Sequence, residues 1–86
     1  MTTEDIMALR SFGKDPNTNG EHCPTVWLDE DKGEFVFQGW KADEVLQAQC
    51  LATGPIPDTE AVVRLPIRMV QQIREACDAA EGAAVR

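Results

Sequence analysis

The stretch that decides the fold is PTVWLDEDKGEFVFQGW, residues 24–40. Thr25–Asp29 and Glu34–Trp40 are rich in β-branched and aromatic residues, which favour strands. Between them, Asp31-Lys32-Gly33 fits a three-residue hairpin loop, in which a type I turn is followed by a glycine in the left-handed region. The stretch therefore predicts a β-hairpin.

The length of this loop sets the expected register of the hairpin. The pairs expected across it are Leu28 with Val36, Val26 with Gln38, and Trp27 with Phe37. Side chains alternate between the two faces of a strand, so each face receives its own apolar group. One face is expected to carry Trp27, Phe35 and Phe37, and the other Val26, Leu28, Val36 and Trp40. Because both groups are apolar, we expect neither face simply to meet water.

Two helices and a third strand are expected after the hairpin. Ala42–Leu51 has helical spacing, and Gly54–Asp58 is a loop because its two prolines exclude regular pairing. Glu60–Leu65 has the pattern of a strand. The strongest helical pattern is Ile67–Ala80, which Pro66 is suited to begin and Gly82 to end. Its apolar stripe is expected to comprise Ile67, Val70, Ile73, Cys77 and Ala80, with Met69 and Ala76 beside it.

The N-terminal segment has weaker signals. Residues 1–12 have the features of a marginal helix, with Thr3 as its cap, and Gly13–His22 is rich in turn-forming residues. Helices this short are unstable unless they dock against another element. We therefore expect residues 1–22 to be poorly ordered.

These elements, in the order ββαβα, predict an α+β fold. A small three-stranded, mainly antiparallel sheet is formed by the hairpin plus one strand, and the C-terminal helix packs on one of its faces. We expect a single domain over residues 23–82 and a frayed C-terminus over residues 83–86.

Composition excludes several classes of function. The 86 residues carry a net charge of -7, which argues against nucleic acid and against an anionic membrane surface as partners. The three cysteines, Cys23, Cys50 and Cys77, are odd in number and widely spaced, which does not fit a disulfide framework. The chain begins with acidic residues, unlike a secretory signal, and contains no apolar run of about 20 residues. A cytoplasmic location is the expectation.

Catalytic and metal-binding patterns are weak. His22 and Cys23 are the one adjoining pair of potential metal ligands, whereas zinc sites need about four. Adjacent side chains on an extended segment point in opposite directions, so His22 is poorly placed to activate Cys23. Cys50 and Cys77 are interpreted as small buried hydrophobes. We therefore expect no enzyme activity, no cofactor and no metal.

Aromatic and acidic side chains gather on the hairpin and at its end. Aromatic residues dominate the energetics of interfaces, so we predict an interaction surface here. For the acidic residues, a solvated turn that discourages aggregation is the competing interpretation. The candidate surface comprises Trp27, Phe35, Phe37, Trp40, Asp29, Glu30 and Asp31.

Three segments carry a resemblance: residues 23–27 (CPTVW), 35–41 (FVFQGWK) and 62–66 (VVRLP). Together they resemble a group of small uncharacterised actinobacterial proteins with a Cys-Pro-Thr start, a hairpin ending in Val-Gln-Gly-Trp-Lys, and a Val-rich strand closed by proline. Genes of that group often lie near helix-turn-helix regulators, so the resemblance implies an accessory interaction role. It implies no catalytic residues.

The sequence thus leads to two hypotheses from different classes. The first is a small non-enzymatic interaction or regulatory protein, acting as a homodimer or with a transcription regulator. The alternative is a small-molecule or metal-binding domain with a pocket between the hairpin and the C-terminal helix, and with His22 and Cys23 at its mouth.

Overall fold

The computed structural model describes residues 9–16 and 23–84 of the chain. The elements follow one another as β1 (Leu9–Lys14), β2 (Thr25–Asp29), β3 (Glu34–Gln38), β4 (Trp40–Lys41), α2 (Glu44–Cys50), β5 (Val63–Arg64), the 3-10 helix η1 (Ile67–Met69) and α3 (Val70–Ala84). The expected helix in residues 42–51 is confirmed as α2, whose first turn is capped by the Asp43 carboxylate accepting from the backbone N–H of Leu46 at 2.8 Å.

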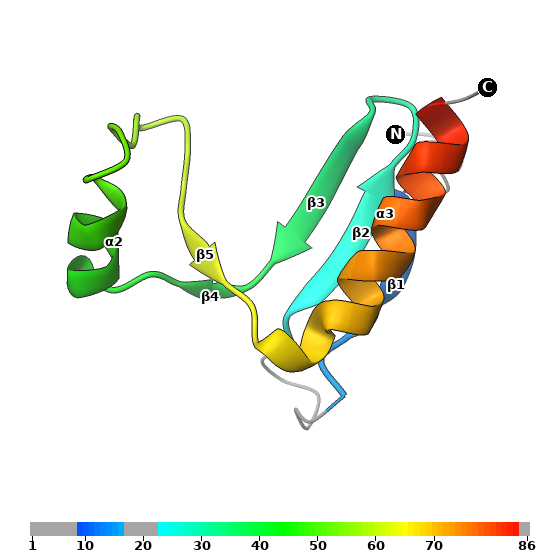
Figure 1. Ribbon diagram of the computed structural model, residues 1–86, viewed down its shortest axis with the longest axis horizontal. Coiled ribbons are helices and arrows are strands. Elements are labelled where there is room, and N and C mark those ends of the chain that lie inside the picture. The colour runs from blue at the N-terminus through cyan, green and yellow to red at the C-terminus, as the bar shows by residue number, and fades with distance from the viewer. Residues whose placement is uncertain (1–8, 17–22, 85–86) are drawn as a thin grey trace, which may run out of the picture.

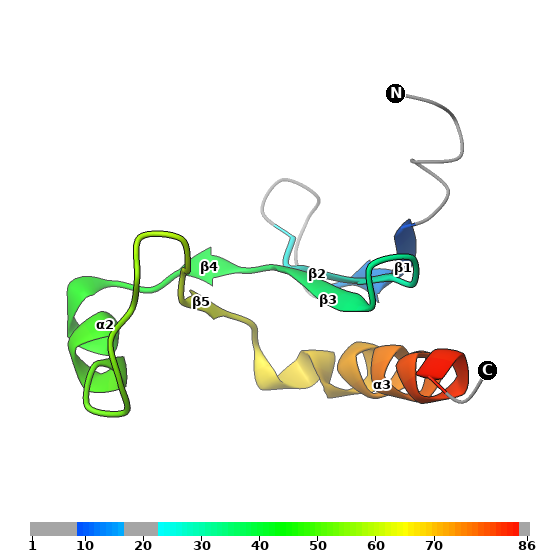
Figure 2. The same cartoon turned by 90° about the horizontal axis from the view of Figure 1, so that it is seen from above.

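The predicted fold class is confirmed. Strands β1, β2 and β3 form an antiparallel sheet in the spatial order β1-β2-β3, and α3 crosses one face of it (Figures 1 and 2). The helix contacts β1 and β2. The core between the two layers is built from Val26, Met69 and Ala76, with Phe12, Leu65 and Ile73 packed against it.

The third strand of this sheet is β1, and not the segment Glu60–Leu65 as expected. The helix expected over residues 1–12 is also wrong in its described part, residues 9–12. These residues are extended, and Leu9, Arg10 and Ser11 pair with β2. Pairing with the open edge of β2 supplies backbone hydrogen bonds that override a weak local helix propensity. Residues 1–8 and most of the loop expected at Gly13–His22 lie outside the described residues.

The register of the hairpin differs from the expected one by a single residue. The observed pairs are Val26 with Phe37, Trp27 with Val36, Leu28 with Phe35, and Asp29 with Glu34. The loop therefore holds four residues, from Glu30 to Gly33, and Gly33 adopts a φ of 68°, which favours glycine. The physical reason is that an Asp29 Oδ1 atom accepts from the backbone N–H of Lys32 at 3.1 Å, which makes Asp29 the last paired residue.

This one-residue difference redistributes the aromatic side chains between the faces. Directly opposed residues share a face, so Phe35 and Phe37 lie with Leu28 and Val26. Val26 is buried against α3. The two phenylalanines therefore belong to the face that α3 partly covers, and the expected grouping of both with Trp27 is wrong.

Helix α3 is rotated relative to the expected stripe. Met69 and Ala76 are fully buried, whereas Ile67 is 91% exposed and Val70 is also exposed. Met69, Ile73 and Ala76 thus face the sheet. This stripe is narrower than the one expected from all the apolar residues, because only the side chains directly over the sheet are buried. The helix also continues through Gly82 to Ala84, so Gly82 does not end it.

An arm made of β4, β5 and α2 extends from the sheet (Figure 1). Of the expected strand Glu60–Leu65, only Val63–Arg64 is extended, and it pairs with Trp40–Lys41 of β4 and not with the main sheet. The Cα radius of gyration is 14.7 Å, whereas a compact chain of this length has about 12 Å. The arm accounts for this open shape.

Gly39 joins the sheet to the arm at a close approach of two backbone segments. A Cβ atom at this position would lie 2.5 Å from the carbonyl oxygen of Arg64. Only glycine therefore fits between β3 and β4 where the chain crosses the segment that leads into η1. This is the structural reason for the Gln-Gly-Trp sequence at the end of the hairpin.

Replacing Met69 tests the observed helix orientation. We expect Met69→Ala to lower the free energy of unfolding by about 2–5 kcal/mol, because it leaves a cavity in the core. The matched control is Ile67→Ala two residues earlier, which should change stability by less than about 0.5 kcal/mol. Chemical denaturation of both variants measures the difference. Equal losses, or a larger loss for Ile67→Ala, would support the stripe expected from the sequence.

Replacing Gly39 tests the close approach at the base of the arm. Gly39→Ala should cost about 1–3 kcal/mol through overpacking against the Arg64 backbone. It should also speed amide exchange at Ala42, whose N–H donates to the carbonyl oxygen of Val62. Gly54→Ala is the control, because no atom lies within 4 Å of its added Cβ. Unchanged exchange at Ala42 in Gly39→Ala would contradict the assigned role.

Candidate functional site

Strand β3 carries two exposed aromatic residues, Phe35 and Phe37, and the strand with these two rings is called the aromatic edge. The rings are 45% and 44% exposed, and they stack with centroids 6.1 Å apart and an interplanar angle of 14°. They lie two residues apart on the same face of β3. Two large apolar side chains are thus held side by side and open to solvent.

The aromatic edge is also an unpaired strand edge. The sheet order is β1-β2-β3, and within residues 9–16 and 23–84 no strand pairs with the outer side of β3. An edge of this kind presents backbone N–H and C=O groups to any approaching strand. Natural edges are usually protected by proline, lysine or a bulge, whereas the five residues of β3 contain a single charged side chain, Glu34.

One flank of α3 continues the apolar surface. Gln72 lies on the other flank, next to β1, because its Cγ would be 3.4 Å from a Cβ placed on Gly13. Val70 is displaced from Gln72 around the helix by about half a turn. It therefore lies on the β3 side, where it lines a shallow hollow together with Leu65, Ile67 and Ile73.

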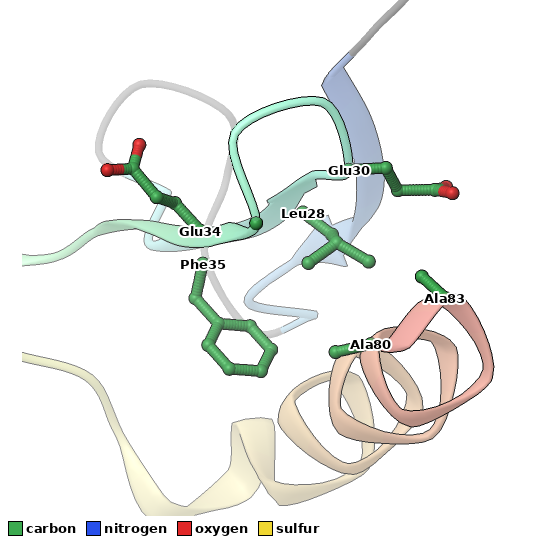
Figure 3. Close-up of a pocket in the computed structure, with 7 residues that line it drawn as sticks. Leu28, Glu30, Glu34, Phe35, Ala80 and Ala83 are labelled. Atoms are coloured by element: carbon green, nitrogen blue, oxygen red, sulfur yellow. The ribbon is translucent and has the colours of Figure 1, made fainter. Parts of the chain in front are cut away.

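A second hollow lies between the hairpin and the end of α3 (Figure 3). It has a volume of about 320 Å³ and is lined by Leu28, Glu30, Gly33, Glu34, Phe35, Ala80 and Ala83. In Figure 3, Leu28 and Phe35 point from the sheet toward the helix, whereas the carboxylates of Glu30 and Glu34 point away from the space between them. The hollow is thus a mainly apolar recess, and the carboxylates of Glu30 and Glu34 are not directed into it.

The acidic residues of the candidate surface are mostly engaged within the hairpin. Asp29 accepts the turn hydrogen bond from Lys32, and Glu30 forms an ion pair with Arg10 at 2.8 Å. Asp31 is exposed in the loop. Two of the three carboxylates therefore stabilise the hairpin locally.

The two tryptophans lie apart from the aromatic edge. Trp27 is half-buried and projects from the opposite face of the sheet, together with Val36. Trp40 belongs to the arm, where the guanidinium carbon of Arg64 lies 5.8 Å from its ring centroid. The structure thus brings Phe35 and Phe37 together but does not gather all the predicted surface residues in one patch.

The cysteines are placed differently from the expectation. Cys23 is buried, Cys50 is half-buried and Cys77 is exposed, so Cys77 is not a buried hydrophobe. This follows from the rotation of α3, which turns Cys77 away from the sheet. Among the residues that the structure describes, no three His, Cys, Asp or Glu side chains are grouped closely enough to hold a metal ion. His22 lies outside them.

An ion pair that the sequence patterns did not predict joins the segment after β1 to η1, just before α3. Arg68 donates from Nε and a terminal nitrogen to both carboxylate oxygens of Asp15, at 2.6 and 2.5 Å. The Asp15 side chain is fully buried. Its hydrogen bonds raise the pKa of Arg68, the negative charge of Asp15 acts in the same direction, and partial desolvation opposes both. The residues are 53 positions apart, so no local pattern reveals the pair.

No family model matches the chain, and no similar protein was found among curated proteins or solved structures. Of the helices in the described part of the chain, none is long and apolar enough to cross a membrane. The surface itself must therefore guide any functional proposal.

Removing Arg68 tests the structural role of the pair. Arg68→Gln should destabilise the fold clearly, because it removes the two charge-assisted hydrogen bonds that Arg68 donates to the buried Asp15 carboxylate. Because the pKa of Arg68 is raised, its contribution to stability is fully present at every pH below the ordinary pKa of arginine and is lost only above it, so the loss in Arg68→Gln should be constant between pH 6 and 9. Arg10→Gln removes an exposed pair and should cost at most about 1 kcal/mol. Thermal denaturation of both variants across this pH range is the measurement, and equal losses would contradict a special role for Arg68.

Proposed function

We propose that this protein is a non-enzymatic interaction protein whose contact surface is the aromatic edge. The observation that carries the proposal is the position of Phe35 and Phe37, which are stacked and nearly half exposed on an unpaired strand. Apolar surface of this kind marks contact sites in proteins that remain soluble. The partner is a protein, either a second copy or a regulator.

Two further features favour a protein partner over other ligands. The outer side of β3 offers main-chain hydrogen bonds, which a strand of another chain satisfies by sheet extension. The exposed Ile67 of η1 and Val70 of α3 extend the apolar area along the helix. The net charge of -7 disfavours nucleic acid and anionic membranes, which are recognised through clustered cations.

The alternative is a small-molecule site, and the recess beside Leu28 and Phe35 is the observation that favours it. It does lie between the hairpin and the C-terminal helix. Cys23, however, lies just before the start of β2, whereas the recess is at the end of that strand. Cys23 therefore does not line the recess. Binding sites usually add a few converging polar groups to an apolar wall, and both carboxylates near this recess point away from it.

Removing the two rings tests the proposed surface. We expect Phe35→Ser combined with Phe37→Ser to weaken binding to the protein partner at least about 30-fold, because buried aromatic residues at interface centres contribute about 2 kcal/mol or more. Sedimentation measures self-association, and affinity capture from the native host followed by titration with the purified partner measures binding to another protein.

Leu9→Ser is the control, because Leu9 is also exposed but lies on β1, at the opposite edge of the sheet. It should bind as the wild type does. The proposal fails if the wild-type protein is a strict monomer that binds no other protein, or if the double variant and the control behave alike. A small molecule retained in native mass spectrometry and lost in Phe35→Ser would instead support the alternative.

A further inference from the structure

Strand β3 has a sequence that is symmetric in its chemistry. Glu34-Phe35-Val36-Phe37-Gln38 places a polar residue at each end, a phenylalanine next to each, and a valine at the centre. An antiparallel pair of identical strands related by a two-fold axis opposes each residue to its mirror position in the strand. A symmetric strand is therefore complementary to a second copy of itself.

Two-fold registers centred on Phe35, Val36 or Phe37 keep at least three residues of this strand paired. A centre at Val36 pairs all five residues, with Phe35 opposite Phe37 on both sides and Glu34 opposite Gln38. A centre at Phe35 opposes Glu34 to Val36, and a centre at Phe37 opposes Val36 to Gln38. Both of these registers place a polar side chain opposite Val36 and so lose an apolar contact. Aromatic pairs across strands are favourable, as is a carboxylate facing an amide that can donate.

We propose that the partner of the aromatic edge is a second copy of this chain, joined by antiparallel pairing of the two β3 strands with Val36 on the two-fold axis. This rests on the proposed function, because it uses the same surface. The pairing joins the two sheets into one of six strands and clusters four phenyl rings on the side of the two α3 helices. The unpaired edges of both β3 strands are then satisfied.

The charges of β3 agree with this arrangement. In this register Glu34 faces Gln38, so no two like charges of the strand are opposed, although each copy carries a net charge of -7.

Disulfide formation at single introduced cysteines tests the register. The background carries Cys50→Ser and Cys77→Ser, and the buried Cys23 stays in place. Val36→Cys should form an intermolecular disulfide under mild oxidation, because opposed Cα atoms in an antiparallel pair lie about 4.5–5.5 Å apart, within disulfide range. Glu34→Cys alone and Gln38→Cys alone should form no such disulfide. In each case the two introduced cysteines of the dimer are about 13 Å apart along the strand.

An equal mixture of Glu34→Cys and Gln38→Cys should form the mixed disulfide, because these positions are opposed. Phe37→Lys should convert the protein to a monomer in sedimentation, with an unchanged circular dichroism spectrum, whereas Leu9→Lys should remain dimeric. The same crosslinks at cysteines on β1, or none above background for Val36→Cys, would overturn the inference.

The failure of this inference is distinguishable from failure of the proposed function. A dimer with crosslinks in another register, or a monomer that binds a different protein through Phe35 and Phe37, refutes the inference alone. A monomer in which the Phe35→Ser, Phe37→Ser variant matches the wild type in every binding measurement refutes both.

Discussion

The hydrogen bond from the Lys32 backbone N–H to the Asp29 carboxylate is the constraint on which the surface of this protein depends. It closes a loop of four residues and so sets which residues of β2 and β3 are opposed. A shift of one residue would move every side chain of β3 to the other face. This short contact at the tip therefore decides that Phe35 and Phe37 share a face with the core residue Val26.

Sharing that face does not bury the two rings, and the reason is geometric. A helix is about 10 Å wide, whereas neighbouring strands are about 4.8 Å apart, so a single helix covers roughly two strands. Helix α3 contacts β1 and β2 and leaves the same face of β3 open. Phe35 and Phe37 thus lie on the core face of the sheet but outside the area that the helix covers, which leaves them exposed.

The sequence predicted the hairpin, the helix at residues 42–51, the C-terminal helix and the α+β class, since each depends on local patterns of residues. The register could not be predicted with equal ease, because loops of three and four residues both fit a glycine at position 33. The role of Leu9–Lys14 depends on pairing with β2, and the Asp15–Arg68 pair joins residues far apart in the chain. Phe35 and Phe37 were identified as surface candidates, but on the wrong face of the sheet.

The arm is less buried than the two layers formed by the sheet and α3. Helix α2 has seven residues and none of them is buried, whereas isolated helices shorter than about 12 residues are marginal in water. The arm is connected to β3 through Gly39 alone, at a crossing that leaves no room for a side chain. The position of the arm relative to the sheet therefore depends on this crossing, where the backbones of Gly39 and Arg64 meet.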